Sequence, residues 1–279
     1  MIPAPFDYAR PQTLDEALAT LASSDDAKVL AGGHSLIPAM KLRLAQPRTI
    51  VDISRLSDLS YIRAANGQIA LGAATTHHAI ESSALLKEKC PLLPEVAAQI
   101  GDAQVRNRGT LGGSLVHADP AADWPAAILA LDAQLEIAGT HGRRTVVATD
   151  FFVEMMQSAV QPNEILVEIR VPATAASVAY VKFAQKASGF AIAGVAAIVE
   201  SASKTVRVGV TGVARKAFRA TAVEAALRGK SLNATNIAAA ADKADEGIET
   251  LNDIHASAEF RAHLTRVNTR RALERAWTR

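Results

Sequence analysis

The fold is decided by two glycine-pair segments, Ala31-Gly32-Gly33-His34-Ser35 and Thr110-Leu111-Gly112-Gly113-Ser114, which lie far apart along the chain. Each lies beside apolar, strand-like sequence and contains a hydroxyl residue. Glycine lets a backbone turn sharply and approach a ligand, because no Cβ stands in the way. Successive N–H groups in such a turn form an anion-binding concavity, and a Ser or Thr hydroxyl adds a donor. We therefore predict two glycine loops that hold a dinucleotide diphosphate between them; the alternative is two ordinary tight turns.

Other dinucleotide and nucleotide motifs do not fit the chain. Neither segment contains the Gly-x-Gly-x-x-Gly of a Rossmann fold, and no Gly-Lys-Ser/Thr completes a P-loop. A bound dinucleotide therefore requires a different architecture, in which two loops clamp one pyrophosphate. Asp123 follows the second segment closely enough to fold back onto a ribose. The alternative for Asp123 is an N-cap of a helix that begins at Trp124, which Pro125 near the first helical position favours.

The composition limits the class of protein. A chain of 279 residues suits two or three subdomains, and an apolar fraction of 49% excludes a disordered protein. The net charge of +2 indicates no bulk attraction to nucleic acid, and an aromatic fraction of 4% argues against base-stacking surfaces. The only cysteine is Cys90, so an intrachain disulfide and four-cysteine iron–sulfur ligation are both excluded.

No targeting or membrane segment is evident in the sequence. Residues 1–10 lack the basic start and apolar run of a signal peptide. The longest apolar stretches, such as residues 191–199, are too short to span a bilayer. We therefore expect a soluble, cytoplasmic protein with no transmembrane segment.

Apolar periodicity and turn signals divide the chain into three units, over residues 1–56, 57–175 and 176–279. In the first unit, Thr13 caps a helix that is followed by strands over 28–30 and 49–53. In the second unit, Asn66-Gly67 predicts a hairpin; helices are expected over 79–89, 92–100 and 124–131, and strands over 134–138 and 164–171. In the third unit, strands over 177–185, 191–200 and 206–213 form an antiparallel meander, followed by helices over 220–228, 236–244 and 255–277. The arginines of the last helix predict a solvated face; the alternative is a partner-binding face.

Few side chains in the sequence indicate a catalytic or metal-binding role. His77 and His78 are adjacent and point in different directions on any regular element, and no third ligand lies at a usual spacing, so we expect no metal site. Thr75 and Thr76 are either helix caps or neighbours of the cofactor. Lys182 is either a solvated strand residue or a charge that faces the cofactor. Because no general base is evident, we expect a protein that moves electrons rather than transforms a substrate.

The chain resembles, over essentially its whole length, the FAD-binding medium subunit of the molybdenum hydroxylases (the xanthine dehydrogenase family), in particular the aerobic carbon monoxide dehydrogenase type. The most specific motifs are Leu-Ala-Gly-Gly-His-Ser-Leu-Ile-Pro over 30–38 and Gly-Thr-Leu-Gly-Gly-Ser over 109–114, which continues as Ala-Asp-Pro-Ala-Ala-Asp over 118–123. The resemblance implies an α+β fold of the PCMH type, like that of vanillyl-alcohol oxidases. In that fold two α/β subdomains enclose FAD, and a C-terminal domain adds a three-stranded antiparallel sheet and helices.

The resemblance also implies the residues of the cofactor site. An acidic residue at Asp123 would lie near the ribose, and Phe190 would lie beside the flavin ring, where the carbon monoxide enzymes often carry a tyrosine. No catalytic residue and no metal ligand is implied in this chain. The implied FAD contacts are Leu30, Ala31, Gly32, Gly33, His34, Ser35, Leu36, Thr75, Thr76, Ile100, Thr110, Gly112, Gly113, Ser114, Asp123, Leu166, Lys182 and Phe190.

The resemblance implies an electron-transfer subunit that binds FAD noncovalently. A large partner subunit would hold molybdopterin, and a small one two [2Fe–2S] clusters, in a dimer of heterotrimers. FAD would pass electrons to a quinone, NAD or oxygen. The first alternative is the medium subunit of an N-heterocycle or aldehyde hydroxylase. Two further alternatives are a stand-alone flavin oxidoreductase, including one with FAD attached through His34, and a binding subunit whose glycine segments are only turns.

Overall fold

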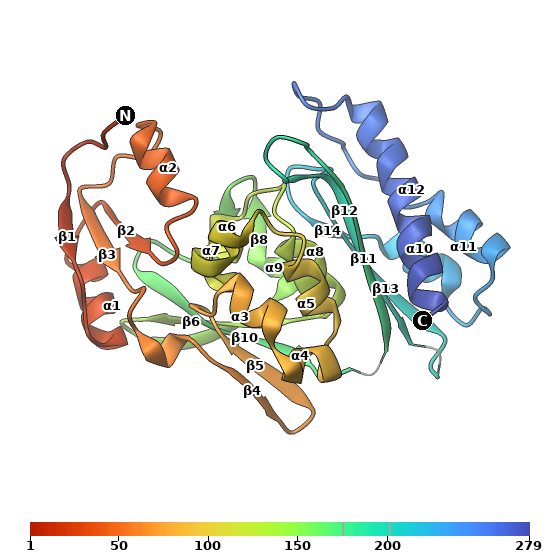
Figure 1. The fold of residues 1–279 in the computed structure, drawn as a ribbon, viewed down its shortest axis with the longest axis horizontal. Coiled ribbons are helices and arrows are strands. Elements are labelled where there is room, and N and C mark those ends of the chain that lie inside the picture. The colour runs from red at the N-terminus through yellow and green to blue at the C-terminus, as the bar shows by residue number, and fades with distance from the viewer. Residues whose placement is uncertain (175, 201) are drawn as a thin grey trace.

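The computed structural model describes residues 1–174, 176–200 and 202–279, and three sheets follow one another along this chain (Figure 1). The first sheet is small and parallel, with the strand order β1-β3-β2. Helix α1 begins after Thr13, whose hydroxyl accepts the N–H of Glu16 at 3.2 Å, as predicted. The elements of this N-terminal unit are β1 (Asp7–Ala9), α1 (Leu14–Ala22), β2 (Ala27–Leu30), α2 (Leu36–Lys41) and β3 (Thr49–Asp52).

The second sheet has five strands in the order β4-β5-β10-β6-β7, and its neighbouring strands are antiparallel. Asn66 and Gly67 join β4 to β5 with φ values of 51° and 72°, as the type I′ turn requires, so the predicted hairpin is confirmed. The strands are β4 (Ile62–Ala65), β5 (Gln68–Gly72), β6 (Gln134–Gly139), β7 (Gly142–Val147) and β10 (Glu164–Pro172). A 3₁₀ turn (Ser57–Leu59) precedes this sheet, and β8 (Phe152–Glu154) and β9 (Gln157–Ser158) pair separately.

Short helices form a layer against the second sheet. The single helix predicted over 79–89 is wrong, because Ser83 is extended (φ −63°, ψ 115°) and its hydroxyl accepts the N–H of Leu86 to begin a second helix. The helices are α3 (His77–Ser82), α4 (Ala84–Lys89), α5 (Leu92–Ala97), α6 (Ala103–Arg108), α7 (Leu111–His117), α8 (Trp124–Ala130) and α9 (Ala148–Phe151). Except for α6, which buries no residue, these helices form one core with Ile69, Leu71 and Ile137 of the sheet.

The third sheet is antiparallel with the order β11-β12-β13-β14, which confirms the predicted meander but adds a strand. The expected three-stranded sheet is therefore wrong, because the two-residue β14 pairs with Gly209 and Val210 and is too short for a periodic signal. The strands are β11 (Ser177–Ala184), β12 (Ala191–Glu200), β13 (Thr205–Thr211) and β14 (Phe218–Arg219). The helices are α10 (Thr221–Leu227), α11 (Ala234–Ala241) and α12 (Ala258–Trp277).

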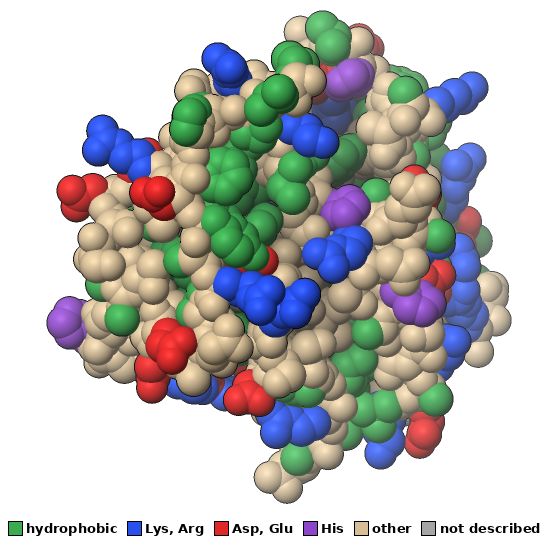
Figure 2. All heavy atoms as spheres, turned by 60° about the vertical axis from the view of Figure 1, so that its left-hand side comes forward, with side chains coloured by type: hydrophobic (Ala, Val, Ile, Leu, Met, Phe, Trp, Pro, Cys, Tyr) green, Lys and Arg blue, Asp and Glu red, His purple; other side chains and the backbone are tan. Residues whose placement is uncertain are grey.

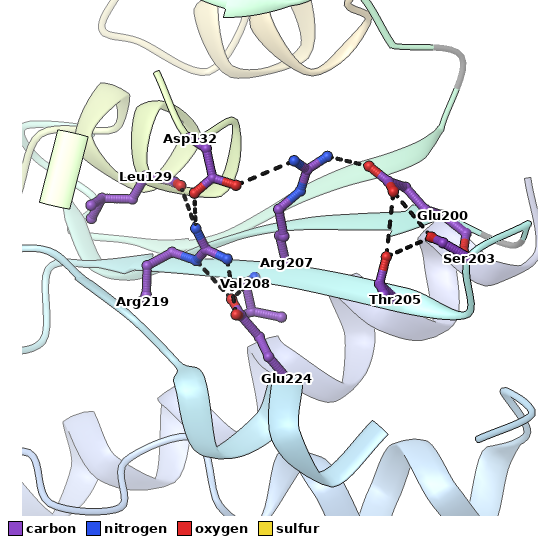
Figure 3. A network of polar contacts seen from close by, with 9 residues as sticks. All are labelled: Leu129, Asp132, Glu200, Ser203, Thr205, Arg207, Val208, Arg219 and Glu224. Atoms are coloured by element: carbon purple, nitrogen blue, oxygen red, sulfur yellow. Dashed lines mark hydrogen bonds and ion pairs between the residues drawn. The ribbon is translucent and has the colours of Figure 1, made fainter. Parts of the chain in front are cut away.

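Helix α8 connects the second unit to the third sheet. A Cβ on Gly209 of β13 would lie 2.0 Å from the carbonyl oxygen of Ala126, so α8 packs directly on this strand. Just after α8, Asp132 pairs with Arg207 of β13 and Arg219 of β14 (Figure 3). The other face of the sheet is covered by α12 (Figure 1). Strand β12 is buried along nearly its whole length because helices cover both of its faces.

The last helix departs from its prediction at one arginine. Arg261 is only 4% exposed; its guanidinium donates to the carbonyl oxygens of Ile192 and Gly212 and pairs with Asp253 at 2.6 Å. The solvated face predicted for this helix is therefore wrong at Arg261, whereas Arg270 and the arginines beyond it are exposed. In the described residues, no helix combines the length and the apolar character that a bilayer span requires.

Candidate functional site

The two glycine-pair segments meet in space. A Cβ on Gly32 would lie 2.2 Å from the carbonyl oxygen of Arg108 and 2.9 Å from the Cα of Gly109. A Cβ on Gly113 would lie 3.8 Å from the Cβ of Ala31. The loop after β2 therefore lies against the segment that joins α6 to α7, between the N-terminal unit and the helical layer (Figure 1). The predicted juxtaposition of the two segments is confirmed.

The first segment is a loop with free backbone donors. Within the described part of the chain, the N–H groups of Gly32, Gly33, His34 and Ser35 donate to no protein acceptor. Gly33 has a φ of +78°, a conformation that side chains rarely adopt. The His34 ring folds back, with Nδ1 3.1 Å from the carbonyl oxygen of Gly32. Four successive free donors around such a glycine form a backbone concavity of the kind that binds anions.

The second segment is not the loop that the sequence predicts. Helix α7 begins at Leu111, and the Thr110 hydroxyl caps it by accepting the N–H of Gly113 at 3.1 Å. The N–H groups of Leu111 and Gly112 donate to the carbonyl oxygens of Thr75 and Ala73 at 2.9 and 2.8 Å. The expectation of a second set of free backbone donors is therefore wrong, because carbonyl oxygens of the residues before α3 already accept hydrogen bonds from these N–H groups.

Glycine in the second segment allows α7 to pack closely against the residues after β5. A Cβ on Gly112 would lie 2.6 Å from the Cβ of Ala73, so this helix fits against the end of β5 only with glycine. Among the described residues, the Ser114 hydroxyl and the Thr110 N–H have no protein partner. These two groups are the donors that the second segment can offer to a ligand beside the first loop.

Asp123 and Lys182 form a buried ion pair. Asp123 is 6% exposed and accepts from the Tyr180 hydroxyl at 2.5 Å and from Lys182 Nζ at 3.0 Å. Lys182 Nζ also donates to the carbonyl oxygens of Gln99 and Gly189 at 2.6 and 2.8 Å. Burial raises the pKa of the Asp123 carboxyl, and the Lys182 ammonium and the Tyr180 hydroxyl oppose that shift. Burial and the adjacent Asp123 also raise the pKa of Tyr180 well above its usual value.

This cluster excludes one of the two alternatives that the sequence left open for Asp123 and for Lys182. The Asp123 side chain does not cap α8, because its oxygens face Tyr180 and Lys182 instead. Lys182 is not a solvated strand residue, because its ammonium is enclosed and all three of its protons have protein acceptors. The cluster joins the helical layer to the third sheet, together with the backbone bond from Gly212 N–H to the carbonyl oxygen of Pro120 at 2.7 Å.

The remaining predicted residues lie in different surroundings. Thr76 caps α3 by accepting the N–H of Ala79 at 3.2 Å, so its cap interpretation is confirmed. The Thr75 hydroxyl instead bonds the backbone of Tyr61 and is buried. Leu166 is packed in the core on β10. Leu30, Leu36 and Ile100 are only partly buried. Phe190 is 46% exposed and follows Gly189, whose carbonyl oxygen accepts a hydrogen bond from Lys182.

The sequence analysis missed one residue near the meeting point. His77 follows Thr76 directly and is 4% exposed; a Cβ on Gly109 would lie 2.6 Å from its Nε2 atom. Trp124 Nε1–H donates to His77 Nδ1 at 3.1 Å. From the sequence we considered the adjacent histidines only as a metal pair, which we did not expect, and gave His77 no other role. The neighbouring second segment was the only signal that could have associated His77 with a ligand.

The surface beside this meeting point combines apolar and basic groups. Figure 2 views the side of the molecule that carries the N-terminal unit, and hydrophobic side chains gather there next to Lys and Arg side chains. Exposed apolar residues on and after α2 include Ile37, Leu42 and Leu44. The free donors of the first loop fit a diphosphate, and the glycine contacts place the second segment, with its Thr110 N–H and Ser114 hydroxyl, beside that loop. The residues present therefore fit a dinucleotide.

Comparisons with known proteins match the whole chain. A model of the FAD binding domain in molybdopterin dehydrogenase matches residues 4–174, and a model of the CO dehydrogenase flavoprotein C-terminal domain matches residues 178–276. The carbon monoxide dehydrogenase medium chain of Hydrogenophaga pseudoflava is 40% identical, over 100% of this chain and 99% of that protein. The 6-hydroxypseudooxynicotine dehydrogenase complex subunit alpha of Paenarthrobacter nicotinovorans is 37% identical, over 99% and 96%.

Solved structures have the same fold. Carbon monoxide dehydrogenase from Hydrogenophaga pseudoflava, in a form that lacks the Mo-pyranopterin moiety, gives a TM-score of 0.96 at 42% identity, over 100% of this chain and 99% of that chain. Quinoline 2-oxidoreductase from Pseudomonas putida 86 gives 0.95 at 33% identity, over 100% and 99%. These matches confirm the predicted α+β architecture with an FAD-binding part and a C-terminal part.

Proposed function

The chain belongs to the family of FAD-binding subunits of the molybdopterin dehydrogenases, and from this premise we propose that it is the electron-transfer subunit of a heterotrimeric molybdenum hydroxylase of the carbon monoxide dehydrogenase type. The observation that carries the proposal is the loop of free N–H groups over 32–35, which lies against the segment 108–114. When bound, FAD supplies the redox chemistry, and the protein supplies binding, orientation and electrostatics.

The residues of the first loop hold the diphosphate in this proposal. The N–H groups of Gly32 to Ser35 donate to its oxygens, and the Thr110 N–H and the Ser114 hydroxyl donate from the other side. Ala31 and Gly113 line the contact between the two segments, and Gly112 packs the second segment against Ala73. Leu30 and Leu36 flank the loop, and Thr75 and Thr76 support it through the backbone of the second segment.

Asp123 retains a role at the ribose in this proposal. A carboxylate has about four acceptor positions, and the hydrogen bonds from Tyr180 and Lys182 use two of them, which leaves room for a ribose hydroxyl. Lys182 has no proton left for the cofactor, so its role is to hold the turn that carries Phe190. Phe190 offers an exposed ring to the face of the flavin. Ile100 and Leu166 supply apolar support behind these polar groups.

The partners follow from what this chain lacks. Its single cysteine, Cys90, is buried, and burial raises the pKa of its thiol to about 12. The [2Fe–2S] clusters therefore belong to a small partner subunit, and molybdopterin belongs to a large one that oxidises the substrate. The assembly is a cytoplasmic dimer of heterotrimers, and electrons leave through FAD to a quinone, NAD or oxygen.

A second candidate keeps the same role in an enzyme with a different substrate. Phe190 lacks the hydroxyl that the carbon monoxide enzymes often carry at this position. The 6-hydroxypseudooxynicotine dehydrogenase subunit and the quinoline 2-oxidoreductase chain are similar to this chain over 99% and 100% of its length. The second candidate is therefore the medium subunit of an N-heterocycle or aldehyde hydroxylase.

The test is an absorption spectrum of the purified chain, with the released cofactor identified by mass after acid denaturation. We expect one intact FAD per chain, and we expect Gly33→Val and Gly113→Val to lose it. A folded wild-type chain that takes up no FAD, alone and in its native complex, would overturn the proposal. Normal FAD content in both folded variants would overturn the role of the two segments. Turnover of carbon monoxide or an N-heterocycle by the native complex then separates the two candidates.

A further inference from the structure

His77 is a buried polar residue at the meeting point of the two glycine-pair segments. It begins α3, and its backbone N–H donates to the carbonyl oxygen of Gly109 at 3.0 Å. Its ring packs on Gly109, where a Cβ would lie 2.6 Å from Nε2 and 2.8 Å from Cδ2. Gly109 in turn lies against Gly32 of the first loop. The ring therefore lies directly behind the contact between the segments.

The tautomer of His77 is fixed by Trp124. The indole Nε1–H donates to Nδ1 at 3.1 Å, and both side chains are buried. An indole can only donate, so Nδ1 must accept. In the neutral ring the other nitrogen, Nε2, therefore carries the proton. Burial, together with the charges of His34 and Arg106, lowers the pKa of His77 to about 4, so the ring is neutral at pH 7.

The Nε2–H group has no acceptor within the described residues. It makes no hydrogen bond there, although the ring is 4% exposed. The side-chain nitrogen and oxygen atoms that are both sealed from solvent and unpartnered are Arg261 Nε and Thr269 Oγ1. His77 Nε2 is not one of them, so this unpartnered atom keeps a small solvent-accessible surface. A buried donor of fixed direction that lacks a partner is costly unless a ligand or water accepts its proton.

We propose that His77 is a further cofactor-binding residue, which donates its Nε2 proton to a diphosphate oxygen of the FAD held by the first loop; this rests on the proposed function. The donor is uncharged, so it adds a directed hydrogen bond beside the backbone N–H groups rather than an ion pair. Trp124 then acts as a positioning residue, because it keeps the proton on Nε2.

The test compares ligands with and without a diphosphate on the full-length apo chain. His77→Leu removes the donor, and His77→Gln keeps an N–H group near the position of Nε2. His78→Ala is the matched control, because His78 is the exposed neighbour on the same helix. A hydrogen bond to a charged group corresponds to about ten-fold or more in affinity. We expect His77→Leu to weaken FAD and ADP by this factor and to leave riboflavin unchanged. We expect His77→Gln and His78→Ala to bind all three ligands like the wild type.

Several results would overturn the proposal. One is unchanged affinity of folded His77→Leu for both FAD and ADP. Another is an equal loss for riboflavin, which would mean a general disturbance of the site. If His77→Leu does not fold, ¹⁵N NMR of the wild-type chain decides: we expect an Nε2–H signal that shifts when ADP is added, and an unmoved signal overturns the contact. A wild-type chain that binds no FAD would instead contradict the proposed function itself.

Discussion

Gly32 lies so close to Arg108 that a Cβ on Gly32 would be 2.2 Å from the Arg108 carbonyl oxygen. The atom that the Cβ would meet belongs to the backbone, so no change of side-chain rotamer could relieve the clash. The distance between the loop after β2 and the end of α6 is therefore set by the absence of a side chain. This contact fixes the free N–H groups over 32–35 relative to Ser114, and the proposed diphosphate site depends on that arrangement.

We predict that Gly32→Ala separates the two segments. The backbone clash should lower the free energy of unfolding by about 2 kcal/mol. It should also weaken FAD binding by about ten-fold or more, because the donors no longer converge. Urea unfolding and fluorescence titration with FAD measure the two effects.

Gly67→Ala is the control for this prediction. Gly67 has a φ of +72° but open space around its Cβ position, so the change costs about 1 kcal/mol through backbone strain alone. It should leave the FAD affinity unchanged. Equal FAD affinity in Gly32→Ala and the wild type would show that the close contact does not position the donors.

The sequence predicted the helices and turns whose ends are set by neighbouring residues. Thr13 and Glu16 signalled the start of α1, and Asn66-Gly67 signalled the hairpin of β4 and β5. Apolar runs with short connections predicted the central strands of the third sheet. The association of the two glycine-pair segments could also be inferred, because both combine a Gly-Gly pair with a hydroxyl residue.

Long-range partners could not be predicted in this way. The N–H group of Gly112 is satisfied by Ala73, which no local motif of the second segment indicates. The Asp123 carboxylate bonds Tyr180, 57 residues away, so the N-cap signal of Asp-Trp-Pro was overridden by a tertiary contact. Strand β14 has two residues and no period to detect.

Asp132 should stabilise the contact between α8 and the third sheet. It pairs with Arg207 and Arg219, and Arg219 also pairs with Glu224 at 2.7 Å (Figure 3). The backbone at Asp132 adopts the left-handed conformation (φ 49°). Asp132→Asn is the suitable change, because Asn tolerates that conformation. The Asp132 side chain is 52% exposed, so solvent screening limits the expected loss of unfolding free energy to about 1 kcal/mol.

Salt separates this charge effect from packing. The loss for Asp132→Asn should shrink in 1 M salt, where the Debye length is about 3 Å. Lys243→Gln, which breaks an exposed pair with Glu246, should change stability by less than about 0.5 kcal/mol. A loss for Asp132→Asn that is the same at low and high salt would contradict an electrostatic role.

His77 should make stability depend on pH. Its folded pKa of about 4 lies below the ordinary value of 6.5, because burial disfavours the charged ring. The folded state therefore binds fewer protons than the unfolded state between these values. The stability from neutral His77 is complete above about pH 6.5 and is lost as the pH falls from 6.5 toward 4. The loss between pH 7.5 and pH 5 should be about 2 kcal/mol.

His77→Gln isolates this contribution, because glutamine does not titrate. Urea unfolding of the wild type and of His77→Gln at pH 7.5 and pH 5 gives the loss of unfolding free energy of each protein over this pH range. Other titrating groups, such as His117, contribute equally to both losses. We expect the wild type to lose about 2 kcal/mol more than His77→Gln over this range. Equal losses would mean that the folded His77 accepts a proton as readily as the unfolded one.

The buried pair of Asp123 and Lys182 should be strongly coupled. Lys182→Met leaves the Asp123 carboxylate buried without its cation, which should cost about 3–5 kcal/mol of unfolding free energy. Asp123→Asn should cost a similar amount, because the ammonium then lies buried among neutral oxygens. In the double variant neither charge remains, so its loss should be well below the sum of the single losses.

A double-mutant cycle by urea unfolding measures this coupling, and FAD content reports on the site. If the pair only joins the helical layer to the third sheet, the double variant should regain stability and the Phe190 turn should lose its anchor at Gly189. If Phe190 lies beside the flavin as proposed, the fluorescence of bound flavin should then change, while the proposed diphosphate contacts should retain FAD. Additive losses in the cycle would contradict the coupling, because two charges 3.0 Å apart inside a protein cannot act independently.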